Sequence, residues 1–296
     1  MEYRMTSDRT MHPYFLSTVN ELDDTVRPYA EEYLGDHSQP VSIFVSPANM
    51  YPRNYRFRLI PQKVLIFSRK GVMQIGYSEK RGGKPTISCL EAEDILLVKN
   101  SMYLLYGKLE IWSKKTNASP VIDIEYNTVA HDSLRPYIQT LIEHSWKTHP
   151  DPEIHLTPDD SYEKLFNISY SFYNGILTEG LHKDERILSV IFQPEISKKY
   201  LKYLSKKLSP TTCLAFTDRQ LIVLQQDIRY RVHHEWLFSF FPWFYCGNLN
   251  ISRDEFGSRC QIEIGMNYLA NFLFDSRQME ELQGIYSKWR PGKTYP

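Results

Sequence analysis

Histidines near the middle of the chain are the first residues whose chemistry needs testing. His144, His149 and His155 surround a proline-rich segment, and Asp151 lies among them. Imidazole and carboxylate groups bind zinc when they converge on one point and are held by neighbouring hydrogen bonds. A proline-rich segment is a poor scaffold for such convergence. We therefore expect these histidines to be solvated or packed, and we predict no metal site.

Signatures of catalysis are missing from the sequence. His233 and His234 are adjacent, so on a strand they would point to opposite faces and could not readily share an ion. The chain has no G-x-x-x-x-G-K-[ST] or G-x-G-x-x-G phosphate loop, no H-E-x-x-H and no G-x-S-x-G elbow. The four cysteines form no C-x-x-C pair, so we interpret them as buried thiols in a reducing cytoplasm. We predict a protein that is not an enzyme, with no catalytic residues and no cofactor.

A lysine-rich segment from Pro194 to Pro210 predicts attraction to anions. Ile196, Tyr200, Leu204 and Leu208 recur every four residues, so we expect an amphipathic helix here. Each lysine close to an anionic membrane contributes about 1 kcal/mol to binding. The alternative is a helix that packs on its own domain and leaves its lysines solvated. The candidates for lipid binding are Lys198, Lys199, Lys202, Lys206 and Lys207.

An aromatic-rich stretch, Glu235 to Gly247, predicts either a partner surface or additional internal packing. Successive side chains of a strand point to opposite faces, so only half of the aromatic rings in this stretch can lie in the core of one β domain. We expect at least one of Phe240, Phe241 and Trp243 to be largely exposed and to contact a partner protein. The alternative is burial against a preceding helix or the other half of the chain. The candidates for partner binding are Trp236, Phe240, Phe241, Trp243 and Phe244.

The charge balance restricts the classes of partner. The chain has 296 residues, with 35 basic and 35 acidic side chains, so no net charge attracts it to nucleic acid and none is expected as a partner. It has no apolar run long enough to span a membrane and no secretory signal at its start. We expect a cytoplasmic protein, peripheral on the inner membrane face if the lysines bind lipid.

Two similar stretches indicate that the chain contains a repeat. "PVIDIEYN" (120–127) and "CQIEIGMN" (260–267) share isoleucine, acid, isoleucine and a later asparagine, with Ile124 and Ile264 separated by 140 positions. The same shift aligns alternating apolar positions without a gap back to Leu97. Each half also has a leading helical pattern and a closing amphipathic helix that contains a tryptophan, Trp146 or Trp289. We interpret this as a duplication that pairs Ile124 with Ile264 and Trp146 with Trp289.

The repeat predicts three segments. The first is an N-terminal helix with the first domain (1–147), the second is a proline-rich linker (148–160), and the third is a helix with the second domain (161–296). Within each half, about seven short antiparallel strands precede the closing helix. The expected fold class is α+β and mainly β, with two partly open barrels, each closed at one end by its C-terminal helix.

The turn "CLAFTDRQLIVLQ" (213–225) resembles the early hairpin of bacterial pleckstrin-homology-like domains. Members of that family often have an apolar strand, a Thr-Asp-basic turn and another apolar strand, as Thr217, Asp218 and Arg219 do here. "RLIPQKVLIFSRKG" (58–71) matches the pattern loosely, at Pro61, Gln62 and Lys63. The resemblance implies two such domains in tandem, over about 40–147 and 183–290. It implies no catalytic residues, and it leaves the ligand open because the family binds phosphoinositides, peptides or proteins.

Two functions are favoured by the sequence, and a hydrolase whose site forms between the two halves is a distant third. The first is a cytoplasmic adaptor or scaffold that binds an unidentified protein through the aromatic stretch. The alternative is a peripheral membrane protein that binds anionic lipid headgroups through the lysine-rich segment. Salt separates them, because lysine-mediated attraction weakens with ionic strength whereas an aromatic contact does not.

Overall fold

The computed structural model describes ten stretches of the chain. They are residues 12–35, 40–53, 56–77, 83–116, 119–147, 154–201, 204–227, 235–254, 257–265 and 268–289. Contacts divide the chain into two compact units. The first contains Met1–Ile95 and Met102–Thr148, and the second contains Leu96–Ser101 and His149–Pro296. Of the predicted linker, residues 154–159 form neither helix nor strand, and 148–153 lie outside the described residues.

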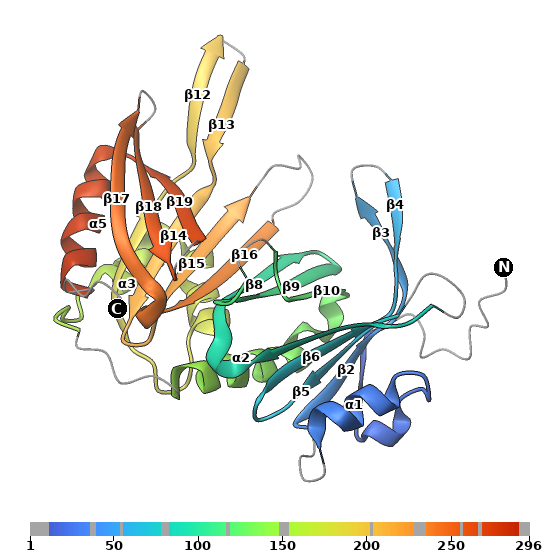
Figure 1. The fold of residues 1–296 in the computed structure, drawn as a ribbon. Coiled ribbons are helices and arrows are strands. Elements are labelled where there is room, and N and C mark those ends of the chain that lie inside the picture. Colours follow the sequence, from blue (N-terminus) through green and yellow to red (C-terminus); the bar gives the residue numbers. More distant parts are fainter. Residues whose placement is uncertain are drawn as a thin grey trace. The chain divides into compact units, whose positions relative to one another are not determined.

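The first half of the chain consists of ten strands, several short helical elements and one long helix, α2 (Figure 1). Its helical elements are η2 (Val19–Glu21), α1 (Arg27–Leu34), η3 (Ala92–Asp94), η4 (Thr128–Ala130) and α2 (His131–Lys147). Its strands are β1 (Tyr14–Leu16), β2 (Ser42–Ser46), β3 (Asn49–Arg53), β4 (Arg56–Ile60), β5 (Lys63–Phe67), β6 (Gly71–Gly76), β7 (Thr86–Glu91), β8 (Ile95–Tyr103), β9 (Tyr106–Ser113) and β10 (Ile122–Tyr126).

The second half has the same kinds of element. Its helical elements are α3 (Ser161–Ile168), α4 (Tyr170–Gly175), the π-helical η5 (Ile176–Gly180), η6 (Trp243–Tyr245) and α5 (Ser276–Trp289). Its strands are β11 (Ile187–Gln193), β12 (Ile196–Leu201), β13 (Leu204–Ser209), β14 (Thr211–Thr217), β15 (Gln220–Asp227), β16 (Glu235–Pro242), β17 (Cys246–Asp254), β18 (Gly257–Ile264) and β19 (Tyr268–Phe274). The chain is therefore α+β and mainly β, as predicted, and in the described part no sheet closes into a barrel.

One order of elements occurs twice. The strands β2, β5, β6 and β7 are neighbours in that order, as are β11, β14, β15 and β16. A single 3-10 turn, η3 or η6, then leads into three further strands, β8–β10 or β17–β19, and a long helix, α2 or α5, follows. This repetition explains why strand-like patterns recur in the sequence.

The predicted alignment of the repeat is wrong by one strand. Ile124 lies in β10, the last strand before the closing helix, whereas Ile264 lies in β18, and β19 still separates β18 from its helix. The element order instead pairs β9 with β18 and β10 with β19. Alternation caused the error, because every half-buried strand has the same two-residue period and a shift by one strand preserves the pattern.

The two tryptophans are not equivalent either. Trp289 is fully buried in α5, whereas Trp146 near the end of α2 is partly exposed. Each closing helix follows a residue whose side chain accepts a backbone N–H, Asn127 or Asp275. Counted from these residues, Leu141 occupies the position of Trp289, and both are buried.

Each half extends its first hairpin through a pair of prolines. Gln193 of β11 pairs with Thr212 of β14, and β12–β13 resumes the same register with Ile196 opposite Ser209. Proline lacks an N–H for the ladder, so Pro194 and Pro210 interrupt the sheet and release a separate two-stranded hairpin. In the first half, Pro47 and Pro61 separate β2–β5 from β3–β4 in the same way.

The helix predicted for 194–210 is therefore wrong. Because β11 and β14 are antiparallel partners, the segment that joins them can continue their pairing, and it forms β12 and β13. The four-residue spacing of Ile196, Tyr200, Leu204 and Leu208 also fits two short strands that meet at a turn. Sheet context thus overrides a short helical pattern.

Candidate functional site

The β12–β13 hairpin is the element that presents the lysines. It pairs with no other described strand, and it extends past the ends of the remaining strands of its unit (Figure 1). Lys198 lies directly opposite Lys206, and Ser197 lies opposite Lys207. Like charges opposite each other in a ladder are destabilising, by up to about 1 kcal/mol. The register therefore places two lysines side by side on one face of the hairpin.

The five lysine candidates do not all share one environment. Lys206 is exposed, and Lys198 and Lys207 are partly exposed. Lys207 Nζ forms an ion pair with Glu195 at 2.9 Å, which neutralises it. Lys199 lies in β12 opposite Ser205, and Lys202 lies outside the described residues. Of the lysine candidates whose side chains are described, Lys206 is the one that is exposed.

The aromatic candidates are mostly internal. Phe240, Phe241 and Phe244 are 5%, 2% and 5% exposed, and Trp236 and Trp243 are only partly exposed. None of Phe240, Phe241 and Trp243 is largely exposed, so that prediction is wrong. The strand alternation was predicted correctly: Phe240 shares a face with Phe238, at 6.4 Å between ring centroids, while Phe241 packs 6.3 Å from Tyr268 of β19.

The preceding helices cover one face of β16. Phe172 of α4 lies 5.2 Å from Trp236, ring to ring. Gly175 approaches Leu224 and Phe238 so closely that a Cβ atom there would lie 3.0 Å from the Leu224 side chain. Of the two explanations for the aromatic stretch, burial beneath the preceding helix is the one that these contacts support.

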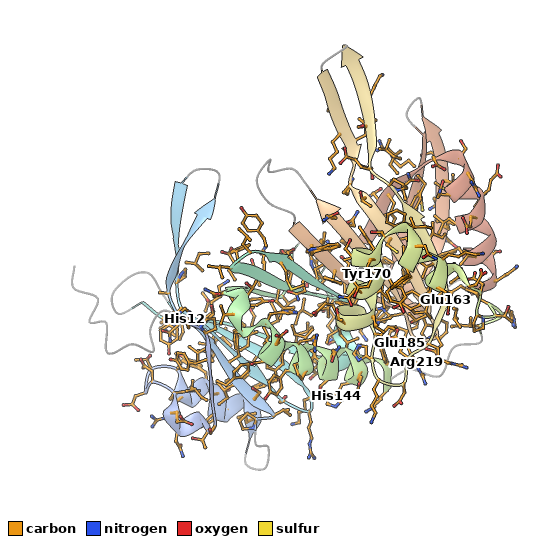
Figure 2. The ribbon with its side chains drawn as sticks, turned by 180° about the vertical axis from the view of Figure 1, so that it is seen from behind. His12, His144, Glu163, Tyr170, Glu185 and Arg219 are labelled. Carbon is orange, nitrogen blue, oxygen red and sulfur yellow. The ribbon has the colours of Figure 1, made fainter. Side chains whose placement is uncertain are left out.

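A buried carboxylate lies at the Thr-Asp-basic turn between β14 and β15. Glu185 accepts a hydrogen bond from the Thr217 hydroxyl, one from the His182 backbone N–H at 3.1 Å and one from Gln220 Nε2 at 3.0 Å. Burial raises the pKa of Glu185 to about 7, although each of these hydrogen bonds lowers it. Glu185 and Arg219 are labelled in Figure 2, which views the molecule from behind.

The surroundings of Glu185 tie this turn to the closing helix. The Trp289 indole N–H donates to the Thr217 carbonyl oxygen at 2.7 Å. Next to it, Asp218 accepts from the Arg186 backbone N–H at 3.0 Å and from its guanidinium at 3.1 Å. The network therefore fixes a turn and contains one group that titrates near neutral pH.

Sequence reasoning found the turn but missed its carboxylate. Glu185 stands among charged residues in "LHKDERI" (181–187), and no local pattern marks it as buried. The sequence pattern also placed the corresponding turn of the first half at Pro61, Gln62 and Lys63. The element order places that copy between β5 and β6, at "FSRKG" (67–71), which matches "FTDRQ" (216–220).

The histidines considered as metal ligands are described only in part. His149 and Asp151, like His233 and His234, lie outside the described residues. His155 is described, and its backbone N–H donates to the Lys288 carbonyl oxygen at 3.1 Å. His144 lies in α2 beside Phe67 and Leu141.

Comparison with known proteins assigns no family. No family model matches the chain, and no curated protein is similar to it. Among the described helices, none is long and apolar enough to cross a membrane.

Proposed function

We propose that the chain is a non-enzymatic binding protein of two pleckstrin-homology-like domains that attaches to anionic phospholipid through the β12–β13 hairpin. Support for the domain type comes from the order of elements, which is four strands, three strands and a closing helix, twice. The Ser/Thr turn with a following basic residue occurs in both halves, at Ser68 and Thr217.

The register of β12–β13 is the observation that carries the proposed ligand. Lys198 faces Lys206 across a hairpin that extends away from its own unit, and no acidic residue occurs from 196 to 217. In the equivalent hairpin of the first half, Arg53 pairs with Arg56 beside the turn. A projecting hairpin with lysines opposite each other is expected where an anionic surface compensates the repulsion.

Vesicle sedimentation tests this function. The unaltered chain should sediment at low salt with vesicles of phosphatidylcholine and phosphatidylserine, and not with phosphatidylcholine alone. Changing Lys198 and Lys206 together to glutamine should weaken binding about 30-fold, from about 1 kcal/mol per lysine. The matched control, Lys164→Gln with Lys183→Gln, removes the same charge from exposed positions elsewhere and should bind normally. Equal loss in both variants would show only a general charge effect and would contradict the proposal.

Protein binding remains the second candidate function. The residues first proposed for it, Phe240, Phe241 and Phe244, are buried and so are poor anchors for a partner. The observation that favours a protein partner lies instead on α3 and α4, where aromatic side chains are exposed.

A further inference from the structure

A carboxylate without a cationic partner among the described residues lies buried in the second unit. Glu185 is 8% exposed. Its hydrogen-bond donors are all neutral groups: the Thr217 hydroxyl, the His182 backbone N–H and the Gln220 amide. The nearby charge that acts on it, that of Asp218, has the same sign. Burying an ionised carboxylate without a cation is costly, so the folded chain favours the neutral acid.

The hydrogen bonds around Glu185 also favour its protonated form. Gln220 is fully buried, and its Nε2 donates to Glu185 at 3.0 Å. Its Oε1 is buried without a hydrogen-bond partner in the part of the chain that the structure describes. A carboxylic acid has an O–H to donate, whereas a carboxylate can only accept. The acid can therefore supply the donor that this amide oxygen lacks, and the carboxylate cannot.

Glu185 lies in a short connection that is attached to the β14–β15 turn at two points. This connection, the 181–186 segment, joins η5 to β11 and forms neither helix nor strand. Its inner attachment is Glu185, and its outer attachment is Arg186, which donates to Asp218 through its backbone N–H and its guanidinium. The Arg186 side chain is 74% exposed, and exposed ion pairs contribute little to stability. Glu185 is therefore the attachment that holds the segment in place.

We propose that Glu185 is a pH-sensitive latch for the 181–186 segment. With its proton, the carboxyl group stays buried and holds the segment on the β14–β15 turn. When the proton leaves to solvent, the carboxylate moves into water and the segment opens at the turn. Lys183 and Asp184 are exposed, so the segment already borders solvent and a local movement is enough to open it.

The direction of the pH dependence follows from the burial. Burial raises the pKa of Glu185 from 4.5 to about 7, whereas in the open segment the carboxyl group would have its ordinary value. The preference for the closed form is therefore complete below pH 4.5 and is lost as the pH rises to 7. The ratio of open to closed forms should rise about tenfold per pH unit between these values and level off above pH 7.

Other titratable and charged groups lie on the elements around Glu185. They are His182, Lys183, Asp184 and Arg186 in its own segment, Asp218 and Arg219 in the turn, Glu179 in η5 and Lys288 in α5. Of these, His182 is buried, and an imidazole can change its charge between pH 5 and 8. A buried imidazole becomes charged as the pH falls, so His182 would open the segment at low pH. The sign of the pH dependence therefore distinguishes His182 from Glu185.

Amide hydrogen exchange of the full chain tests the latch. Exchange is measured by mass spectrometry from pH 5 to pH 8, and each rate is corrected for the intrinsic pH dependence of the exchange chemistry. We expect the protection of the 181–186 segment to fall at least tenfold over this range and to level off near pH 7, while β18 keeps its protection. Constant protection of the segment, a loss toward low pH, or an equal loss in β18 would overturn the proposal.

Three variants assign the effect to Glu185. Glu185→Gln keeps the shape of the side chain but cannot ionise, so protection of the segment should no longer depend on pH. Asp184→Asn is the matched control, because it removes one negative charge from the adjacent, exposed residue, and it should leave the pH dependence unchanged. Asp218→Asn removes the like charge near Glu185 and lowers its pKa, so protection should level off at a lower pH.

Asp218→Asn decides the matter if Glu185→Gln folds poorly, because a merely structural role of Glu185 would not shift the pH at which protection levels off. A pH dependence that survives in folded Glu185→Gln would contradict the latch. So would an Asp218→Asn variant in which protection levels off at the same pH as in the unaltered chain.

Discussion

The turns at Ser68 and Thr217 are two copies of one structure with different partners. In each, the hydroxyl accepts the backbone N–H groups two and three residues later. The Ser68 hydroxyl receives Lys70 and Gly71 at 3.2 and 3.3 Å, and the Thr217 hydroxyl receives Arg219 and Gln220 at 3.1 and 2.9 Å. A side chain that satisfies its own turn in this way fixes the backbone between two strands.

The partners of the two hydroxyls differ in charge. Ser68 bonds the Tyr33 hydroxyl of α1 at 3.0 Å, whereas Thr217 bonds the carboxylate of Glu185. Burial raises the pKa of Tyr33, so its hydroxyl stays neutral over the physiological range, whereas burial brings the pKa of Glu185 to about 7. The closing helices differ too, because Trp289 covers the second turn, and in the first a small hollow remains between Ser68, Leu141 and His144. The hydroxyl of the first turn is thus bonded to a neutral group, and that of the second to a group that titrates near neutral pH.

The largest effect is expected at the tryptophan that only the second turn has. Trp289→Leu should lower the free energy of unfolding by about 2–4 kcal/mol. It removes the ring contact with Phe216, 5.3 Å away, and the hydrogen bond to the Thr217 carbonyl. Urea unfolding followed by far-ultraviolet circular dichroism measures the loss. Trp146→Leu, at a partly exposed position, is the control and should cost less than half as much; equal costs would favour the equivalence of these tryptophans that the repeat predicts.

The second largest effect is the pH dependence of stability, which we expect from Glu185 at the second turn. Because folding raises the pKa of Glu185 from 4.5 to about 7, the folded state favours its protonated form. Protonated Glu185 therefore contributes to the free energy of unfolding, by up to about 3 kcal/mol. This contribution is complete below pH 4.5 and is lost as the pH rises toward 7. Glu185→Gln should therefore gain stability relative to the unaltered chain between pH 5 and 8. Glu163→Gln, which changes an exposed carboxylate, is the control and should give a flat difference across this range.

Removing the Tyr33 hydroxyl, which is the neutral partner of Ser68, should change the free energy of unfolding by a smaller amount. Tyr33→Phe deletes one hydrogen bond to Ser68 and should cost about 1 kcal/mol. The cost should be equal at pH 5 and pH 8, since neither hydroxyl ionises there. A cost that changes with pH would show that the first turn also contains a titrating group, and the contrast between the turns would fail.

The smallest effect concerns the hairpin. Lys206→Gln removes the repulsion with Lys198, so thermal stability should rise slightly, by a few tenths of a kcal/mol, measured at low salt. The gain should disappear at high salt because screening removes the repulsion in the unaltered chain. Lys164→Gln is the comparison and should destabilise slightly, since Lys164 pairs with Asp160. Destabilisation by Lys206→Gln would mean that its ammonium group has a compensating partner within the chain.

The sequence predicted the kinds of element better than their alignment. Alternating apolar residues identified most strands, and the spacing in α2 and α5 identified both closing helices. The alignment failed because strands such as β9, β10, β17 and β18 share one periodicity, and only pairing partners distant in sequence distinguish them. For the same reason Ile196–Ser209 was predicted as a helix: its hairpin depends on β11 and β14, which local spacing does not report.

The candidate sites were predicted as residue types rather than as surfaces. The lysines were found because charge is visible in the sequence, although their register is not. The aromatic stretch was misjudged, because Phe172 and Gly175 of α4 cover β16 and no pattern within 235–247 reveals that cover.

Amide hydrogen exchange of the protein, measured with and without vesicles, is the most direct test that the β12–β13 hairpin binds the anionic lipid surface. The full chain is compared with and without vesicles that contain phosphatidylserine, and protection is read for each segment by mass spectrometry. We predict new protection in Ile196–Leu201 and Leu204–Ser209, lost in the variant with glutamine at 198 and 206, and no change in α5. Protection that appears elsewhere, with β12 and β13 unchanged, would contradict the assignment of the lysine hairpin as the lipid-binding element.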